Sequence, residues 1–204
     1  MEVEIWSDVA CPWCYVGKRR FEAALEQFEH RDDVTITWRS FELDPEAPAE
    51  REGDRAEHLA SKYGMSLEQA HQAEAQMTQT AAADGLDFRF DIARAGNTFD
   101  GHRLVHLAKA HGLQDVMKER LLHAYFSEGE LVSDHDALTR LAVEVGLPED
   151  EVRGVWIPCS ILSIGTAITP PQGSALSEQV ACISLGPTIH HVAYPKRGTQ
   201  SHVP

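Results

Sequence analysis

The residues best suited to chemistry in this chain are Cys11, Pro12, Trp13 and Cys14, which form a C-x-x-C motif. A short apolar stretch, Val3 to Trp6, precedes the motif and a helical pattern follows it, so the cysteines are expected at a helix N-terminus. There the helix dipole and the unpaired N–H groups favour a thiolate at the first cysteine. A spacing of three places the second sulfur on the same helical face, within reach of a disulfide. The motif therefore predicts redox chemistry at a dithiol.

Half of a zinc site is the alternative interpretation of the two cysteines, because structural zinc takes four ligands, usually as two close pairs. The other cysteines, Cys159 and Cys182, lie far apart in the sequence, and His190 and His191 are adjacent. Neither pair has the spacing of zinc ligands, so no metal site is predicted.

A second candidate metal pair is His102 and His106, one helical turn apart. A zincin motif would need glutamate directly after the first histidine, but the residue there is Arg103. Packing or a surface position is therefore the favoured interpretation of this pair.

The elements that position the dithiol are predicted to be strands at residues 3–6 and 34–41, joined by a helix at residues 15–29. The second strand alternates polar residues with β-branched and aromatic ones. The helix carries an apolar stripe made of Val16, Phe21, Ala24, Leu25 and Phe28. A strand, helix and strand with a crossover of this length predict a parallel pair with a right-handed connection.

Helical periodicity dominates the next part of the chain, and strand signals are almost absent from it. Ser66 and Gln69 predict a capping box, Ser133 is expected to cap another helix, and Gly64 and Gly146 are expected to end helices. The helices are predicted at residues 54–63, 66–84, 99–111, 114–127, 133–145 and 149–153.

Composition excludes several classes of protein. The chain has 204 residues and a net charge of −14, and such a surface repels nucleic acid. No run reaches the roughly eighteen apolar residues that a membrane span needs. The N-terminus is acidic and has no signal-peptide pattern, so a cytoplasmic location is predicted, where cysteines are seldom structural disulfides.

Several stretches carry a resemblance to a known family: residues 5–17 around the dithiol, 38–45 at the second strand, 97–98 with 102–104, and 125–129. They resemble the DsbA-like thioredoxin superfamily, in particular its FrnE-like branch related to 2-hydroxychromene-2-carboxylate isomerases. The resemblance covers about residues 2–153. It implies an α/β, thioredoxin-like fold interrupted by an all-helical insertion.

The resemblance also implies roles for individual residues. Cys11 matches the attacking thiol and Cys14 the resolving thiol of a thiol–disulfide oxidoreductase. Pro12 and Trp13 would contact substrates, and Asn97 and His102 would line the substrate cleft. The isomerase relatives have serine in place of Cys11 and use glutathione, so the presence of both cysteines favours redox chemistry over isomerisation.

Three segments are predicted: residues 1–44, the βαβ half with the dithiol; residues 45–153, the helical insertion and return helix; and residues 154–204. In the last segment only Glu178, Lys196 and Arg197 are formally charged, and its apolar pieces alternate poorly. The family should supply a cis-proline loop and two strands there, but Pro187 and Pro158 are poor matches to that loop. The C-terminal strands are therefore predicted to be atypical or missing, through divergence or a change of reading frame.

Other residues near the dithiol receive plainer interpretations. Asp8 is expected to hold the turn before the cysteines by binding backbone N–H groups. Trp13 is expected to form an exposed apolar lip. Lys18, Arg19 and Arg20 are expected on the solvated face of the helix.

The predicted function is disulfide reduction, oxidation or isomerisation by the Cys11–Cys14 dithiol through a mixed disulfide. No cofactor is required, and glutathione is a candidate thiol partner beside disulfide-containing proteins and small thiols. A glutathione-dependent isomerase or transferase, and a non-catalytic or incompletely folded chain, are the alternatives. The oligomeric state is left open, with a dimer among the options.

Overall fold

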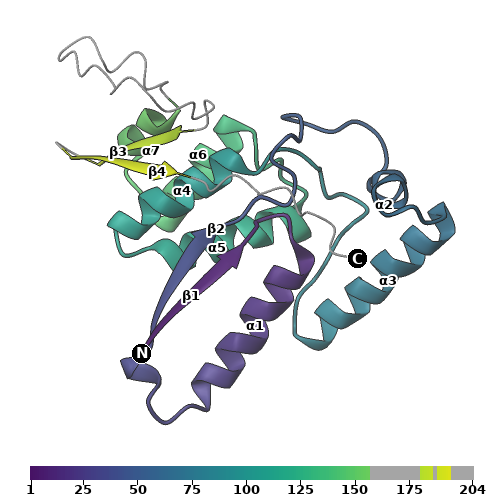
Figure 1. The fold of residues 1–204 in the computed structure, drawn as a ribbon, viewed down its shortest axis with the longest axis horizontal. Helices are drawn as coiled ribbons and strands as arrows, with labels where there is room; N and C mark the ends of the chain where they lie inside the picture. Colours follow the sequence, from purple (N-terminus) through teal and green to yellow (C-terminus); the bar gives the residue numbers. More distant parts are fainter. Residues whose placement is uncertain (157–179, 186–187, 194–204) are drawn as a thin grey trace, which may run out of the picture.

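The computed structural model describes residues 1–156 in full and the backbone of residues 180–185 and 188–193 (Figure 1). Its elements follow in the order β1 (Glu2–Ser7), α1 (Pro12–Glu26), a 3-10 turn (Arg31–Asp33), β2 (Thr35–Ser40), α2 (Arg55–Tyr63), α3 (Leu67–Ala83), α4 (Phe99–Ala110), α5 (Gln114–His123), a π-helical turn (Ala124–Glu128), α6 (His135–Val145), α7 (Glu149–Val155), β3 (Val180–Leu185) and β4 (Thr188–Ala193). In Figure 1, α4, α6 and α7 gather on one side of the first strand pair, and α2 and α3 lie on the other, beyond α1.

Strands β1 and β2 form the parallel pair that the sequence predicts, in a register from Glu2 opposite Thr35 to Ser7 opposite Ser40. The other edge of β2 is met by a side chain. Gln114, the first residue of α5, accepts from the Trp38 N–H and donates to the Trp38 carbonyl, each at 3.0 Å. The amide thus satisfies the backbone groups that a further strand would otherwise bind, and it fixes α5 against the sheet.

Helix α1 begins at Pro12, three residues before the predicted start, because proline suits the first helical turn. Its buried residues are Tyr15, Val16 and Lys18, all in its first turns. The predicted apolar stripe is therefore wrong toward the C-terminus, where Ala24 is exposed and Phe28 lies beyond the helix. Only the first half of α1 packs into the core, so periodicity along the whole helix overstates its buried face.

The core of the molecule lies among α4, α5, α6 and the π-helical turn. Leu104, Met117, Leu121 and Leu138 are fully buried there. Phe126, in the π-helical turn, stacks on Phe88 with ring centroids 4.5 Å apart, and Tyr15 of α1 stacks on Phe88 at 5.8 Å. These aromatic contacts fasten the start of α1 to the helical block.

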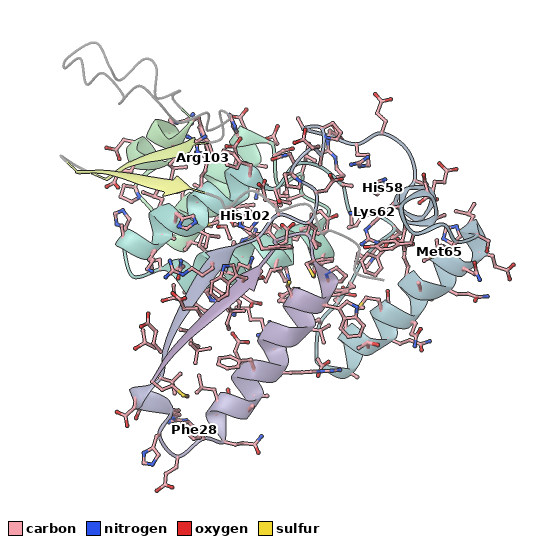
Figure 2. The ribbon with its side chains drawn as sticks, in the orientation of Figure 1. Phe28, His58, Lys62, Met65, His102 and Arg103 are labelled. Carbon is pink, nitrogen blue, oxygen red and sulfur yellow. The ribbon has the colours of Figure 1, made fainter. Side chains whose placement is uncertain are left out.

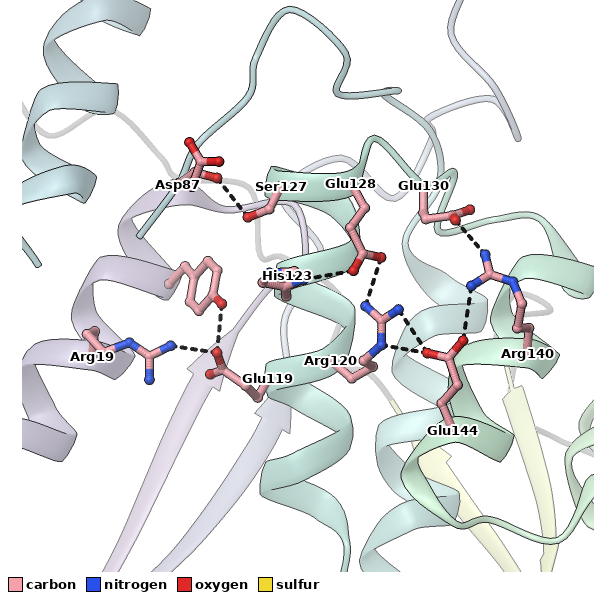
Figure 3. Close-up of polar contacts among 11 residues, drawn as sticks. Arg19, Asp87, Glu119, Arg120, His123, Ser127, Glu128, Glu130, Arg140 and Glu144 are labelled. Atoms are coloured by element: carbon pink, nitrogen blue, oxygen red, sulfur yellow. Dashed lines mark hydrogen bonds and ion pairs between the residues drawn. The ribbon is translucent and has the colours of Figure 1, made fainter. Parts of the chain in front are cut away.

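Polar contacts on the surface join the same helices (Figure 3). Glu119 of α5 accepts from the Tyr15 hydroxyl and from Arg19, each at 2.6 Å. Arg120 of α5 donates to Glu144 of α6 at 2.9 Å. Exposed pairs of this kind stabilise a fold by about 1 kcal/mol at most, so their main effect is to fix which helices are neighbours.

Two helix caps test the sequence predictions directly. The capping box of Ser66 and Gln69 is confirmed, with both reciprocal hydrogen bonds formed. The predicted cap at Ser133 is wrong: Asp134 is the N-cap of α6, and its carboxylate accepts from the Ala137 N–H at 2.7 Å. The Ser133 hydroxyl instead donates to the Ala49 carbonyl. The two residues are far apart in the sequence, so no local pattern predicts this contact.

The predicted boundary at Gly154 falls inside α7. That helix runs on to Val155, and Trp156 stacks on His135 at 4.3 Å and donates to the Thr139 hydroxyl at 3.1 Å. Packing against α6 thus carries the helix past the point where the composition changes.

Strands β3 and β4 pair with each other, antiparallel, from Val180 opposite Ala193 to Leu185 opposite Thr188. In the described part of the chain they form a sheet separate from β1 and β2. Pro158 and Pro187 lie outside the described residues. Within the described residues, no peptide bond is cis. The cis-proline loop and the reading-frame hypothesis therefore stay predictions.

Within the described ranges, no helix has the length and apolar character needed to cross a bilayer. The same ranges hold no cluster of three or more His, Cys, Asp or Glu side chains arranged to bind a metal ion.

Candidate redox site

The dithiol lies between the end of β1 and the first turn of α1. Cys11 is the N-cap of α1 in an extended conformation, with φ −95° and ψ 112°, and the Cys14 N–H donates to its carbonyl at 3.1 Å. Both cysteines are free thiols and half-buried. The sequence places them at a helix N-terminus, and the structure shows them there.

A cavity of about 490 Å³ opens beside the first cysteine. Cys11, Pro12 and Trp13 form one wall, whereas Cys14 is not among the lining residues. The opposite wall comes from α2, α3 and the segments beside them, and its apolar part consists of Leu43, Leu59, Met65, Met77 and Phe90. A substrate in this cavity would therefore meet the sulfur of Cys11 and not that of Cys14.

Cationic side chains lie around the cavity, although the protein as a whole is acidic. Arg51 pairs with Asp44 at 2.8 Å. Arg55 pairs with Glu74 at 2.6 Å and lies over the Phe90 ring, 4.3 Å from its centroid.

Two further basic side chains of the cavity project from α2, His58 and Lys62 (Figure 2). Lys62 has no ion-pair partner among the described residues. Burial, followed by the charges of Arg51 and Lys62, lowers the pKa of His58, so its imidazole is neutral at pH 7.

Behind the cysteines lies a buried carboxylate, that of Asp8. It accepts from the Leu43 N–H at 2.7 Å, the Ala10 N–H at 3.4 Å and His102 Nε2 at 3.3 Å. Burial alone would raise the pKa of Asp8, but the hydrogen bonds from His102 and Leu43 outweigh it and lower that pKa. Asp8 thus holds the turn before the cysteines, as predicted. The same carboxylate also connects this turn to the segment after β2 and to α4.

A buried lysine lies on the same side. Lys118 of α5 is 1% exposed, and its Nζ donates to the Ser7 carbonyl at 3.2 Å. Burial lowers its pKa to about 8.

The two thiols titrate as a pair. A hydrogen bond from the Cys11 thiol lowers the pKa of Cys14 to about 6, with help from Ser7, the Asp8 backbone and the charge of Lys118. The same hydrogen bond raises the pKa of Cys11. The pair therefore holds one proton and one negative charge at neutral pH, and because the proton can cross the hydrogen bond, either sulfur can be the thiolate.

Comparison with known proteins places the chain in a family. The model of the DSBA-like thioredoxin domain matches residues 2–158. The chain belongs to the DsbA-like thioredoxin family. The prediction of that family and of its thioredoxin-like fold is confirmed, while the narrower FrnE-like assignment stays a prediction.

Three known proteins are similar to this chain. A probable DsbA oxidoreductase from Streptomyces coelicolor has a crystal structure that is 47% identical over 76% of this chain and 66% of that one, with a TM-score of 0.71. The uncharacterized protein YwbO of Bacillus subtilis is 28% identical over 72% of this chain and 67% of its own. The cytosolic disulfide reductase DsbM from Pseudomonas aeruginosa, solved with GSH, is 19% identical over 72% of this chain and 66% of its own, with a TM-score of 0.51, and shares the fold. The match thus spans about two thirds of each relative's length.

Two residues that the family resemblance places in the cleft lie elsewhere in this DsbA-like chain. Neither Asn97 nor His102 lines the cavity. The Asn97 side chain donates to the carbonyls of Pro45 and Ala47, each at 3.3 Å, so it braces a loop. His102 lies buried in α4, where its ring binds Asp8 (Figure 2).

A further correction concerns Lys18, predicted on the solvated face of the first helix. It is buried, because that face turns toward α5 and its acidic residues. Its ammonium pairs with Glu22, with Glu119 at 2.9 Å and with Asp115 at 3.4 Å. Arg20, by contrast, is exposed as predicted.

The sequence does not predict that Lys118 is buried near the dithiol or that residues of α2 and α3 line the cavity. Lys118 stands in a helical pattern as one polar residue among others, and no signal marks it as buried. The residues of α2 and α3 reach the dithiol only through the packing of the insertion.

Proposed function

We propose that this DsbA-like chain is a thiol–disulfide oxidoreductase whose working groups are Cys11 and Cys14. One observation carries the proposal: Cys11 lines the cavity beside Trp13, whereas Cys14 is not among the lining residues. This arrangement suits an attacking thiol that substrates can reach and a resolving thiol that they cannot.

In the reductive direction, the thiolate of Cys11 attacks one sulfur of a substrate disulfide. A mixed disulfide forms, and the other substrate sulfur leaves as a thiolate that takes up a proton. The Cys14 thiolate then attacks Cys11, which forms the Cys11–Cys14 disulfide and releases the second substrate thiol. Two electrons pass from the dithiol to the substrate, and the reverse sequence would donate a disulfide. The reaction needs no metal or organic cofactor.

The cavity favours small thiols and disulfides among the candidate substrates. Its volume of about 490 Å³ suits a tripeptide-sized ligand, and Arg51, Arg55 and Lys62 could meet carboxylates. Glutathione is the leading candidate, in keeping with the GSH named in the DsbM structure. In a reducing cytoplasm, the location proposed from the sequence, glutathione would keep the resting enzyme a dithiol.

Insulin reduction by the wild-type protein and by Cys11→Ser tests the proposal. We expect the wild type to reduce insulin and to show an ultraviolet-absorbing thiolate below about pH 7.5, and we expect Cys11→Ser to be inactive. Equal activity of the two proteins, or no activity and no such thiolate, would defeat the proposal. Small-molecule isomerisation that survives in Cys11→Ser would support a glutathione-dependent isomerase instead.

A further inference from the structure

Three ionisable side chains lie buried at the segment that leads from β1 to the dithiol, and none of them lines the cavity. Asp8 is 2% exposed, and His102 and Lys118 are 1% exposed. They come from the turn after β1, from α4 and from α5. Burying a charge costs several kcal/mol unless other charges and hydrogen bonds compensate it, so a buried ammonium needs a compensating partner.

The two buried lysines of the protein differ in their partners. Lys18 lies within 4 Å of three carboxylates, those of Glu22, Asp115 and Glu119. Lys118 has no carboxylate at that distance among the described residues, and its hydrogen bond there goes to the Ser7 carbonyl. The charge of Lys118 is therefore compensated at longer range.

Asp8, Cys14 and Cys11 are close enough to Lys118 for their negative charges to favour its charged form, and the charge of Lys18 opposes it. His102 approaches from α4, but burial lowers its pKa, so it binds Asp8 as a neutral ring. Glu42 lies near Asp8, and burial, followed by the charges of Asp8 and Asp100, raises its pKa to about 7.

The charges around Lys118 therefore change with the redox state. In the reduced protein its ammonium faces the carboxylate of Asp8 and one negative charge on the dithiol. In the oxidised protein the disulfide is neutral, and Asp8 alone remains opposite the ammonium. The attraction between Lys118 and the thiolate exists only in the reduced form.

Building on the function proposed above, we propose that Lys118 is a positioning residue for disulfide exchange, whose buried ammonium stabilises the thiolate of the reduced dithiol and so makes the protein a weaker reductant. Its hydrogen bond to the Ser7 carbonyl fixes the ammonium at the end of β1, four residues before Cys11. Because Lys118 belongs to α5, the helical insertion supplies this charge, while the βαβ unit supplies the sulfurs.

The test compares Lys118→Gln and Lys118→Met with the wild type. Glutamine keeps a donor for the Ser7 carbonyl and removes the charge, whereas methionine removes both. We expect both variants to raise the pKa of the thiolate, followed by ultraviolet absorbance, by about one unit. At pH 8 the equilibrium with glutathione should then shift about tenfold toward the protein disulfide, which corresponds to about 30 mV.

Lys18→Gln is the matched control, because it removes the charge of a buried lysine that faces carboxylates. It should lower the thermal midpoint and leave the thiolate pKa close to that of the wild type. A Lys118→Gln protein with the wild-type thiolate pKa would overturn the proposal, since Lys118 would then only hold the Ser7 carbonyl.

A measurement on the wild type keeps the proposal testable if the variants do not fold. The 13Cε signal of Lys118 should titrate at higher pH in the reduced protein than in the oxidised one. The same titration in both forms would overturn the proposal. Failure of the proposed function looks different: the wild type would then be as inactive toward insulin as Cys11→Ser, whatever the thiolate pKa of Lys118→Gln.

Discussion

The surroundings of the dithiol differ in polarity and in solvent exposure between the cavity side and the buried side. On the cavity side, Cys11 and Trp13 meet an open, largely apolar wall supplied by α2, α3 and their flanking segments. On the buried side lie the carboxylate of Asp8, which binds the ring of His102, and the ammonium of Lys118, all nearly inaccessible to water. In the proposed mechanism, separate parts of the chain therefore contact the substrate and control the thiolate charge.

This separation predicts different responses to mutation on the two sides. Changes on the buried side should alter stability and titration, because low-dielectric surroundings strengthen electrostatic interactions. Changes on the cavity side should alter substrate affinity and leave the fold intact. Variants matched across the two sides test this difference.

The largest effect is expected at the sulfurs themselves. Cys14→Ser should stop turnover and accumulate a mixed disulfide on Cys11, because the resolving thiolate is gone. Mass spectrometry after incubation with oxidised glutathione should show one glutathione adduct per chain. Cys11→Ser should form no adduct at the cavity, and an adduct on Cys14 in that variant would contradict the assignment of Cys11 as the accessible sulfur.

Asp8→Asn should destabilise the protein by roughly 2–4 kcal/mol. It removes a buried charge that is held by hydrogen bonds from His102, Leu43 and Ala10 and that faces Lys118. Urea unfolding measures the change. The cavity-side control is Asp44→Asn, which breaks a partly exposed pair with Arg51 and should cost less than about 1 kcal/mol. Equal losses would show that the buried side holds no special share of the stability.

Acid should destabilise the protein through α4. Burial lowers the pKa of His102, and burial together with His102 lowers the pKa of His106 to about 4. Below pH of about 6.5 the unfolded chain binds protons that these folded imidazoles do not, so the free energy of unfolding falls as the pH drops toward 4. Stability that the carboxylate of Asp8 contributes is lost at still lower pH, because its folded pKa is also lowered.

Urea unfolding at several pH values, repeated for His106→Gln, measures this dependence. Glutamine can keep the hydrogen bond to Ser40 and cannot titrate, so the loss between pH 6.5 and 4 should shrink by roughly 1–2 kcal/mol. His58→Gln is the control on the cavity side, where a more exposed ring should change the slope less. If the free energy of unfolding of His106→Gln depends on pH as it does in the wild type, His106 does not contribute to the loss of stability in acid.

The sequence predicts the dithiol and the elements that carry it, but neither the opposite wall of the cavity nor the buried charges. The C-x-x-C motif, the parallel strands and the cap at Ser66 are local patterns, and the structure shows all three. Lys18 is buried because carboxylates of α1 and α5 compensate its charge, and Lys118 is buried where it donates to the Ser7 carbonyl, 111 positions away. Periodicity ranks any lysine as a surface residue, so such compensation stays invisible until the helices are packed.

The positions of Asn97 and His102 illustrate the same limit. Family resemblance suggests that these residues matter near the site, but it does not say on which side of the sulfurs they lie. The loop carbonyls bound by Asn97 and the carboxylate bound by His102 decide that, and both contacts join residues more than forty positions apart.

The smallest expected effect concerns two exposed tryptophans, of which only one lines the cavity. Trp13 at the cavity and Trp6 on β1 are 59% and 60% exposed, so truncating either should change the free energy of unfolding by less than about 1 kcal/mol. Trp13→Ala should raise KM for oxidised glutathione about three- to tenfold, because an exposed ring beside Cys11 supplies apolar contact area. Trp6→Ala should leave KM unchanged, since Trp6 does not line the cavity. An equal rise in both variants would mean that apolar surface in general, and not this wall, attracts the substrate.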